Sequence, residues 1–129
     1  MKTKTIQLLP SRWSLDVIIS SSEEKVKKHL LENFGIHEEY VYDGGKHVNS
    51  VVTVSTGLDT KYKGESRVLI ILESNRKPHI VVHEIIHVLW HLSKHSGIDM
   101  HYHSQEWQAM MAEYLFTEIT NNKGYLKIN

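Results

Sequence analysis

The spacing of apolar residues changes along this chain and predicts helices and strands in turn. After Ser21–Glu24, the residues Val26, Leu30 and Phe34 recur every four positions, and Gly35 follows them. This spacing places the three apolar side chains on one side of a helix, which the serines and acids begin and the glycine ends. We therefore expect a short helix whose apolar side belongs to the core.

Strand-like segments lie on both sides of that helix. A short strand is predicted from Thr3 to Leu9, and the run from Arg67 to Glu73 (RVLIILE) is typical of a buried strand. Between them, Glu39 to Tyr42 and His47 to Ser55 flank an Asp-Gly-Gly turn and predict a hairpin. The polar, glycine-containing segment from Thr56 to Ser66 predicts a loop.

Two longer helices follow. Proline suits the first turn of a helix from about Pro78 to Lys94, which should end near Gly97. Its buried face should be formed by Ile80, Val81, Ile85, Val88, Leu89 and Leu92. After a loop from Ser96 to His103, Ser104 is expected to cap a last helix from Gln105 to Thr120. This order predicts a single α+β domain over residues 1–129, with a small mixed or antiparallel sheet packed on the two helices.

The amino-acid composition limits the classes of protein and the kinds of metal site that this chain can form. Hydrophobic residues make up 40% and charged residues 23% of the 129 positions, which is ordinary for one globular domain. The formal net charge is zero, so nothing indicates a nucleic-acid partner. The chain has no cysteine, which excludes disulfides and cysteine-type zinc sites. Any metal ion must therefore be held by histidine, aspartate or glutamate.

The segment His83–His87 (HEIIH) is an HExxH sequence inside the first long predicted helix. Residues four apart on a helix project from one side, so His83 and His87 can hold one zinc ion. Glu84 is turned toward the same pocket and can accept a proton from a zinc-bound water. Three of the ten histidines continue the same spacing: His79, His91 and His95. Each step rises about 6 Å along the helix, so only two of these five histidines can serve one zinc.

A hydrolytic zinc site usually has three protein ligands and one open position for water. We expect Glu106 to be the third ligand, because it begins the last predicted helix and the preceding loop is long enough to turn that helix back beside the first. His103, just before this helix, and Glu113, two turns into it, are the alternatives.

The HEIIH segment followed by Glu106–Ala109 (EWQA) resembles the gluzincin arrangement of zinc metallopeptidases, in which a glutamate on a later helix completes the site. A closer similarity, in Ser104–Glu106 (SQE) and Tyr114–Ile119 (YLFTEI), is to small, mostly uncharacterised phage-encoded metallopeptidases. The resemblance covers the C-terminal third of the chain well, and the rest only in the order of strands and helices. It implies a minimal zincin-like domain with one zinc ion per chain.

A second resemblance is to the SprT-like proteases, which pair HExxH with a later H-G-x-x-aromatic segment. The stretch His103–Trp107 (HSQEW) is similar but lacks the glycine. This match would make His103 the third ligand and would change the fold and the reaction little.

Together these features predict a zinc-dependent metallopeptidase, a hydrolase acting on peptide or protein substrates. A zinc-activated water would attack the peptide carbonyl, with Glu84 as the general base. The oxyanion would need a further donor, for which the candidates are Tyr102, His101, His103 and His91. By the resemblance to zincin-like folds, the region from Arg67 to Glu73 would hold a substrate strand by β-augmentation.

Two other functions compete with this one. The first is a zinc-stabilised binding or interaction protein with weak or no turnover; Trp13, Trp90 and Trp107 could serve its surface, although core packing is expected for most of them. The second is a zinc hydrolase acting on another amide or on a cell-wall peptide. The chain has neither a membrane-spanning run nor a signal-peptide core, which predicts the cytoplasm, or the host cytoplasm for a phage protein. The oligomeric state is not indicated.

Overall fold

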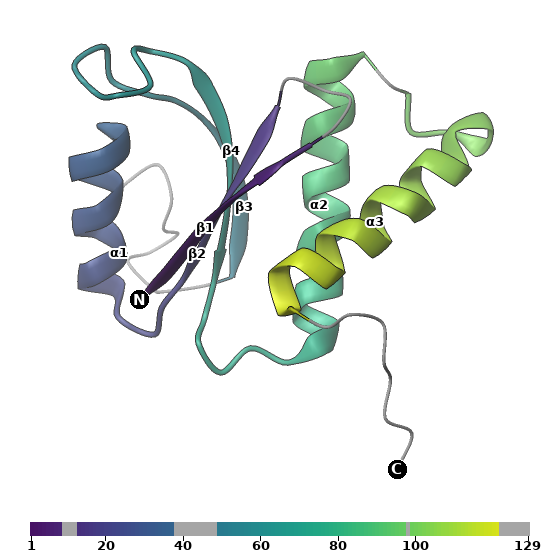
Figure 1. Cartoon of the computed structure of the whole chain (residues 1–129), viewed down its shortest axis with the longest axis horizontal. Coiled ribbons are helices and arrows are strands. Elements are labelled where there is room, and N and C mark those ends of the chain that lie inside the picture. The colour runs from purple at the N-terminus through teal and green to yellow at the C-terminus, as the bar shows by residue number, and fades with distance from the viewer. Residues whose placement is uncertain (9–12, 38–48, 98, 122–129) are drawn as a thin grey trace.

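The computed structural model describes residues 1–8, 13–37, 49–97 and 99–121. A four-stranded mixed sheet lies between one helix on one face and two on the other (Figure 1). The strands are β1 (Lys2–Gln7), β2 (Ser14–Ile19), β3 (Ser50–Ser55) and β4 (Ser66–Leu72). The helices are α1 (Glu23–His29), continued by the π-helical turn η1 (Leu30–Phe34), then α2 (Pro78–Ser96), the 3-10 turn η3 (Tyr102–Ser104) and α3 (Gln105–Thr120). The α+β class expected from the sequence is confirmed.

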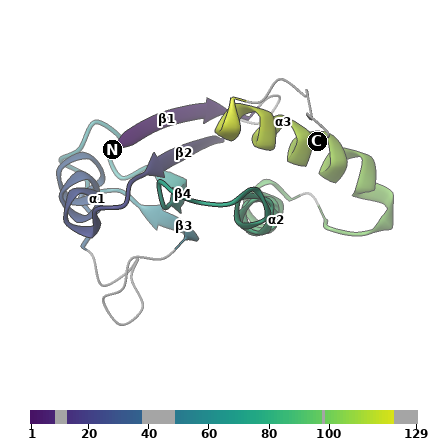
Figure 2. The same cartoon turned by 90° about the horizontal axis from the view of Figure 1, so that it is seen from below.

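The strand order is β1-β2-β4-β3 (Figure 2). Strand β4 pairs in parallel with β2 on one side and antiparallel with β3 on the other, while β1 pairs antiparallel with β2. Helix α1 covers one face of the sheet. On the opposite face, α2 lies beside β3 and β4, whereas α3 lies toward β1 (Figure 2). Helix α2 is thus close to the β3 edge of the sheet, and α3 lies on the side of α2 that faces β1.

Most of the predicted elements are confirmed to within a few residues. Strand β3 is the second half of the predicted 47–55 strand, and the first hairpin strand, at 39–42, falls outside the described residues. The helix stop at Gly35 is confirmed: its φ is 68°, and a Cβ there would come within 3.1 Å of the Gly57 Cα. A side chain at this position would strain the left-handed backbone and crowd Gly57, so glycine suits it best.

Strand β2 is the element that the apolar pattern did not predict. It is central and almost wholly buried, but Asp16 interrupts its apolar sequence. The Arg67 guanidinium of β4 donates two hydrogen bonds to this carboxylate, from Nε at 2.8 Å and from Nη2 at 2.9 Å. Thr5 of β1 donates a third, from Oγ1 at 2.8 Å. A buried charge is tolerated here because it is paired and fully hydrogen-bonded.

Two hydrophobic clusters sit on the two faces of the sheet. The cluster under α1 includes Val26, Leu30 and Phe34, which confirms the predicted apolar stripe. The larger cluster, between the sheet and α2 and α3, contains five of the six residues predicted for the buried face of α2: Val81, Ile85, Val88, Leu89 and Leu92. Ile80, the sixth, is only half-buried. No helix of the described part of the chain is long and apolar enough to span a membrane.

The stability of the protein should fall on mild acidification, partly because of His29 on α1. Burial, and next the positive charge of Lys61, lower the pKa of His29 below its usual 6.5. The unfolded chain therefore takes up a proton before the folded chain does as the pH drops below about 6.5, and the free energy of unfolding decreases. Urea unfolding at several pH values should show a shallower decrease for His29→Gln than for wild type. The exposed-site control His37→Gln should keep the wild-type slope; an unchanged slope in His29→Gln would refute the assignment.

Candidate metal centre

Helix α2 carries the HExxH sequence, and its ends follow the local signals in the chain. Pro78 occupies the first turn, and Gly97, with φ of 75°, ends the helix while its backbone N–H donates to the Ser93 carbonyl. Because one face of α2 packs on the sheet and on α3, the opposite face is left exposed. His83 and His87 lie on this exposed face.

The two histidines of the motif are close enough to share a metal ion. Their Nε2 atoms are 3.3 Å apart, and their rings are inclined at 65°. A tetrahedral zinc with Zn–N bonds of about 2.0–2.1 Å separates two of its nitrogen ligands by about 3.3–3.4 Å. The same distance also permits one imidazole to donate a hydrogen bond to the other. The donor set therefore fits two of the positions around a zinc ion.

Glu84, between these histidines in the sequence, differs from them in being buried, with 7% of its surface exposed. Its carboxylate has no hydrogen-bond partner among the residues that the structure describes. Burial raises the pKa of Glu84, and the positive charge that His87 and His83 can carry opposes this shift. A desolvated carboxyl group beside two potential metal ligands is the kind of group that accepts and returns protons in hydrolytic sites.

No third candidate ligand joins this pair in the part of the chain that the structure describes. Among these residues, no three His, Asp or Glu side chains form a group that could hold a metal ion. His103, Glu106 and Glu113 are all exposed. The assignment of the third ligand to Glu106, or to either alternative, stays a prediction.

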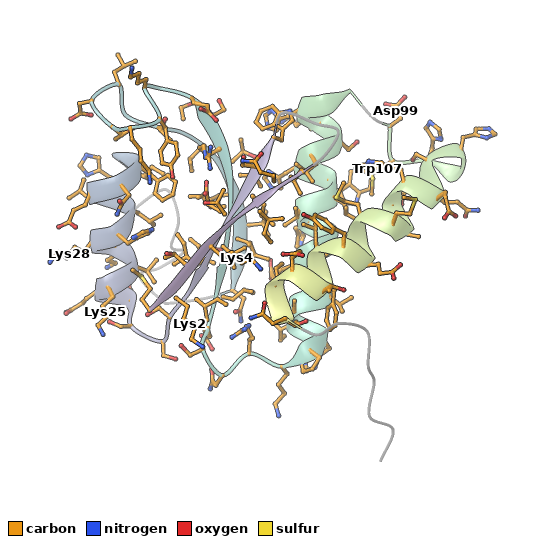
Figure 3. All side chains as sticks on the ribbon, viewed as in Figure 1. Lys2, Lys4, Lys25, Lys28, Asp99 and Trp107 are labelled. Atoms are coloured by element: carbon orange, nitrogen blue, oxygen red, sulfur yellow. The ribbon has the colours of Figure 1, made fainter. Side chains whose placement is uncertain are left out.

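The packing of α3 explains this separation. Helix α3 is fastened to β1, since Lys4 donates from Nζ to the carbonyl and carboxylate of Glu118, and the Tyr114 hydroxyl donates to the Gln7 carbonyl. Trp107 packs against the core between α3 and α2 (Figure 3). The neighbouring Glu106 is rotated by about 100° from Trp107 around the helix and so turns to solvent.

The turn before α3 is held by Ser104, though not as a helix cap. Ser104 occupies the N-cap position, but its hydroxyl donates to the carbonyls of Asp99 and His101 instead of capping α3. The Gln108 side chain donates to the same hydroxyl and to the His101 carbonyl. The predicted N-cap position is correct and the predicted capping bond is wrong.

The expected substrate strand position needs correction. Strand β4, which contains most of the Arg67–Glu73 region, is paired on both sides and cannot accept another strand. In the described part of the chain, β3 has a partner only on its β4 side. Thr53 of β3 shares a hydrogen bond of 2.6 Å with Nδ1 of His91, one turn after His87 on α2. Among the described strands, β1 and β3 are the two edges of the sheet, and β3 is the edge beside α2, joined through Thr53 to the helix with the histidine pair.

Two hollows flank the Thr53–His91 contact. The first, of about 750 Å³, is lined by Thr53, Trp90, His91, Ser93, Lys94 and His95. The second, of about 670 Å³, is lined mainly by apolar residues of β3 with Gly35, Ile36, His37 and His91. The sequence offered one signal for the first hollow, the continued four-residue spacing through His91 and His95. It offered none for the part played by Thr53, which is distant in sequence.

The candidate oxyanion donors are spread over two places. His91 is half-buried and bonded to Thr53, and His101 and His103 are exposed on the turn between α2 and α3. The side chain of Tyr102 is outside the described residues. Among the described residues, neither His91 nor His101 forms a hydrogen bond with Glu84, His83 or His87.

Comparisons of the chain with protein-family models, with curated proteins and with solved structures find no match. The function is therefore inferred from the residues of α2 and from the sheet edge beside them.

Proposed function

We propose that this protein is a zinc-dependent metallopeptidase. The observation that carries the proposal is the pair of Nε2 atoms of His83 and His87, 3.3 Å apart on the exposed face of α2, with the buried Glu84 beside them. The spacing suits zinc, and the carboxyl group suits proton transfer. The resemblance to gluzincin and small phage-encoded metallopeptidases in HEIIH and EWQA points to the same activity.

The residues of the chain have distinct roles in this proposal. His83 and His87 hold the zinc ion, with Glu106 as the preferred third ligand and His103 or Glu113 as alternatives. When bound, zinc supplies an activated water and polarises the peptide carbonyl. Glu84 accepts the proton of the attacking water and returns it to the leaving amine, a role that its raised pKa favours.

The β3 edge is the place where an extended substrate would lie. A peptide that added to this edge would satisfy the outward backbone groups of β3, and α2 would lie alongside it. The Thr53–His91 hydrogen bond keeps the edge and the histidine helix in register. A substrate bound there as a strand could therefore reach the histidine pair.

A zinc-stabilised binding protein is the second candidate, and one observation favours it. Val82, Ile86 and Trp90 form an exposed apolar stripe on α2, next to the histidine pair, and Trp90 keeps 57% of its surface exposed. Trp13 and Trp107 instead pack partly buried against the core, as expected for most of the tryptophans. An exposed apolar stripe is a common feature of partner-binding surfaces.

Zinc stoichiometry tests the metal site itself. Wild-type protein purified with zinc should retain about one ion per chain by elemental analysis, and His83→Ala should retain less than about 0.2. His79→Ala, which removes an exposed histidine one turn earlier on the same helix, should behave like wild type. A wild-type value below about 0.2 would overturn both zinc-based functions.

Peptidase assays then separate the two functions. Zinc-loaded wild type should cleave unfolded protein substrates, and the chelated protein should not. Stoichiometric zinc without cleavage of any substrate would favour the binding protein.

A further inference from the structure

The hollow beside Thr53, with Trp90, His91, Ser93, Lys94 and His95, has a distinct chemical character, and we call it the basic hollow. Of the six lining residues that the structure describes, three can carry positive charge and none is acidic. Lys94 has no ion-pair partner in the part of the chain that the structure describes. Trp90 adds a largely exposed aromatic surface. The hollow therefore presents uncompensated basic groups next to a flat apolar wall.

The electrostatics of His91 agree with this description. Burial lowers the pKa of His91, and positive charge on His95, His87 and Lys94 lowers it further. No acid contributes in the opposite direction. The positive potential around His91 would favour an anionic group from a bound ligand.

The hollow also lies within reach of a peptide on the β3 edge. Side chains alternate along β3: Val51 packs toward α2, and Val52 and Val54 pack toward α1. Residues of an added strand would alternate in the same way, so every second side chain would point toward α2 and the basic hollow. Lys94 lies seven positions after His87, about 10 Å along the helix, which corresponds to about three residues of an extended peptide.

We propose that the basic hollow selects an aspartate or glutamate side chain of the peptide substrate, about three residues from the bond that is cleaved. This inference rests on the proposed peptidase function and extends it to a substrate class. Lys94 and His95 pair with the carboxylate, and the Trp90 ring covers its methylene groups. A second hollow lies on the other side of the Thr53–His91 bond and is lined by Ile36, Val52 and Val54, among others. This hollow takes an apolar side chain of the neighbouring substrate residue.

A matched set of synthetic peptides tests the proposal. The peptides are identical except for one position, which holds Glu, Gln or Lys and is moved stepwise along the peptide. Cleavage by zinc-loaded wild type is measured by mass spectrometry, and binding to zinc-loaded Glu84→Gln is measured by fluorescence polarisation. We expect the best-placed Glu peptide to be bound and cleaved about tenfold better than its Gln counterpart, the size of one charge-assisted hydrogen bond.

A charge reversal locates the selecting group. Lys94→Glu should shift the preference from the Glu peptide to the Lys peptide. Lys94→Gln, which serves as the test variant where Lys94→Glu folds poorly, should abolish the preference. Lys77→Glu makes the same change at the other end of α2 and should leave the preference unchanged.

The outcomes distinguish this inference from the proposed function. Cleavage without an acidic preference, or with a preference that Lys94→Glu leaves unchanged, overturns the inference and leaves the peptidase standing. Acidic peptides that bind by way of Lys94 without being cleaved support the hollow and overturn the peptidase. If no peptide is bound or cleaved, both are overturned.

Discussion

Replacing Glu84 by glutamine should leave zinc binding intact and lower peptide hydrolysis by about 100- to 10,000-fold, the usual contribution of a general base. Glutamine has nearly the same shape as glutamate but cannot accept the proton of the attacking water at neutral pH. Initial rates on an unfolded protein substrate, measured beside zinc content, provide the test. Glu24→Gln, the same change at an exposed position on α1, is the matched control and should keep the wild-type rate. A Glu84→Gln protein that hydrolyses substrate at the wild-type rate would remove Glu84 from the mechanism.

The same substitution has a second readout that does not depend on activity. Because burial raises the pKa of Glu84, ionisation of its carboxyl group costs more free energy in the folded protein than in the unfolded chain. Glutamine carries no charge to desolvate, so metal-free Glu84→Gln should be at least as stable as metal-free wild type in urea at pH 7. A clear loss of stability would mean that the Glu84 carboxylate has a structural partner, and a drop in activity could then not be assigned to proton transfer alone.

Replacing Asp16 by alanine should lower the free energy of unfolding by about 3–5 kcal/mol, because it leaves a buried guanidinium without its main partner. Arg67 is 7% exposed and Asp16 4% exposed. After the substitution, Arg67 would keep the 3.1 Å ion pair with the exposed Glu65 carboxylate and its contact with the Tyr62 ring, but neither replaces the buried carboxylate. Chemical denaturation of the metal-free protein measures the effect. A loss below about 1 kcal/mol, the range of surface ion pairs, would contradict the structure at the centre of the sheet.

Two companion variants control for charge and volume. Glu32→Ala removes an acid whose 3.9 Å pair with Lys28 is largely exposed, and it should cost less than about 1 kcal/mol. The double variant Asp16→Leu, Arg67→Met replaces the buried pair with apolar side chains. It should be more stable than Asp16→Ala, because no unpaired charge remains in the core.

The local signals in the chain predicted most of the secondary structure. Four-residue apolar spacing and end signals such as Pro78, Gly35 and Gly97 depend only on near neighbours, and the helices form where these signals predicted them. Strand β2 was missed because its central position depends on Asp16 being neutralised by Arg67, which is 51 residues away in the sequence. A charged residue interrupts the apolar pattern by which a buried strand is predicted, and its ion-pair partner cannot be identified from the local sequence.

The candidate site also has one part that local sequence predicts and one part that depends on tertiary packing. Helical periodicity fixes the spacing of His83 and His87, so their proximity was predictable from the sequence, and the 3.3 Å separation of their Nε2 atoms agrees. The sequence predicted that α3 turns back beside α2, and the contacts between the two helices confirm it. The rotation of α3 was not predictable, because it depends on contacts with β1 through Lys4 and Tyr114; it leaves Glu106 and Glu113 exposed to solvent.

By itself, the sequence determined the helices, the HExxH pair and the α+β class, since each follows from residues that are neighbours in the chain or on one helix. Only the tertiary structure decided that β4 is internal, that β3 is the edge beside α2 among the described strands, and that Thr53 joins this edge to His91. These features require segments far apart in the sequence to pack together. The burial of the Asp16–Arg67 pair and the packing of α3 on β1 fix that arrangement.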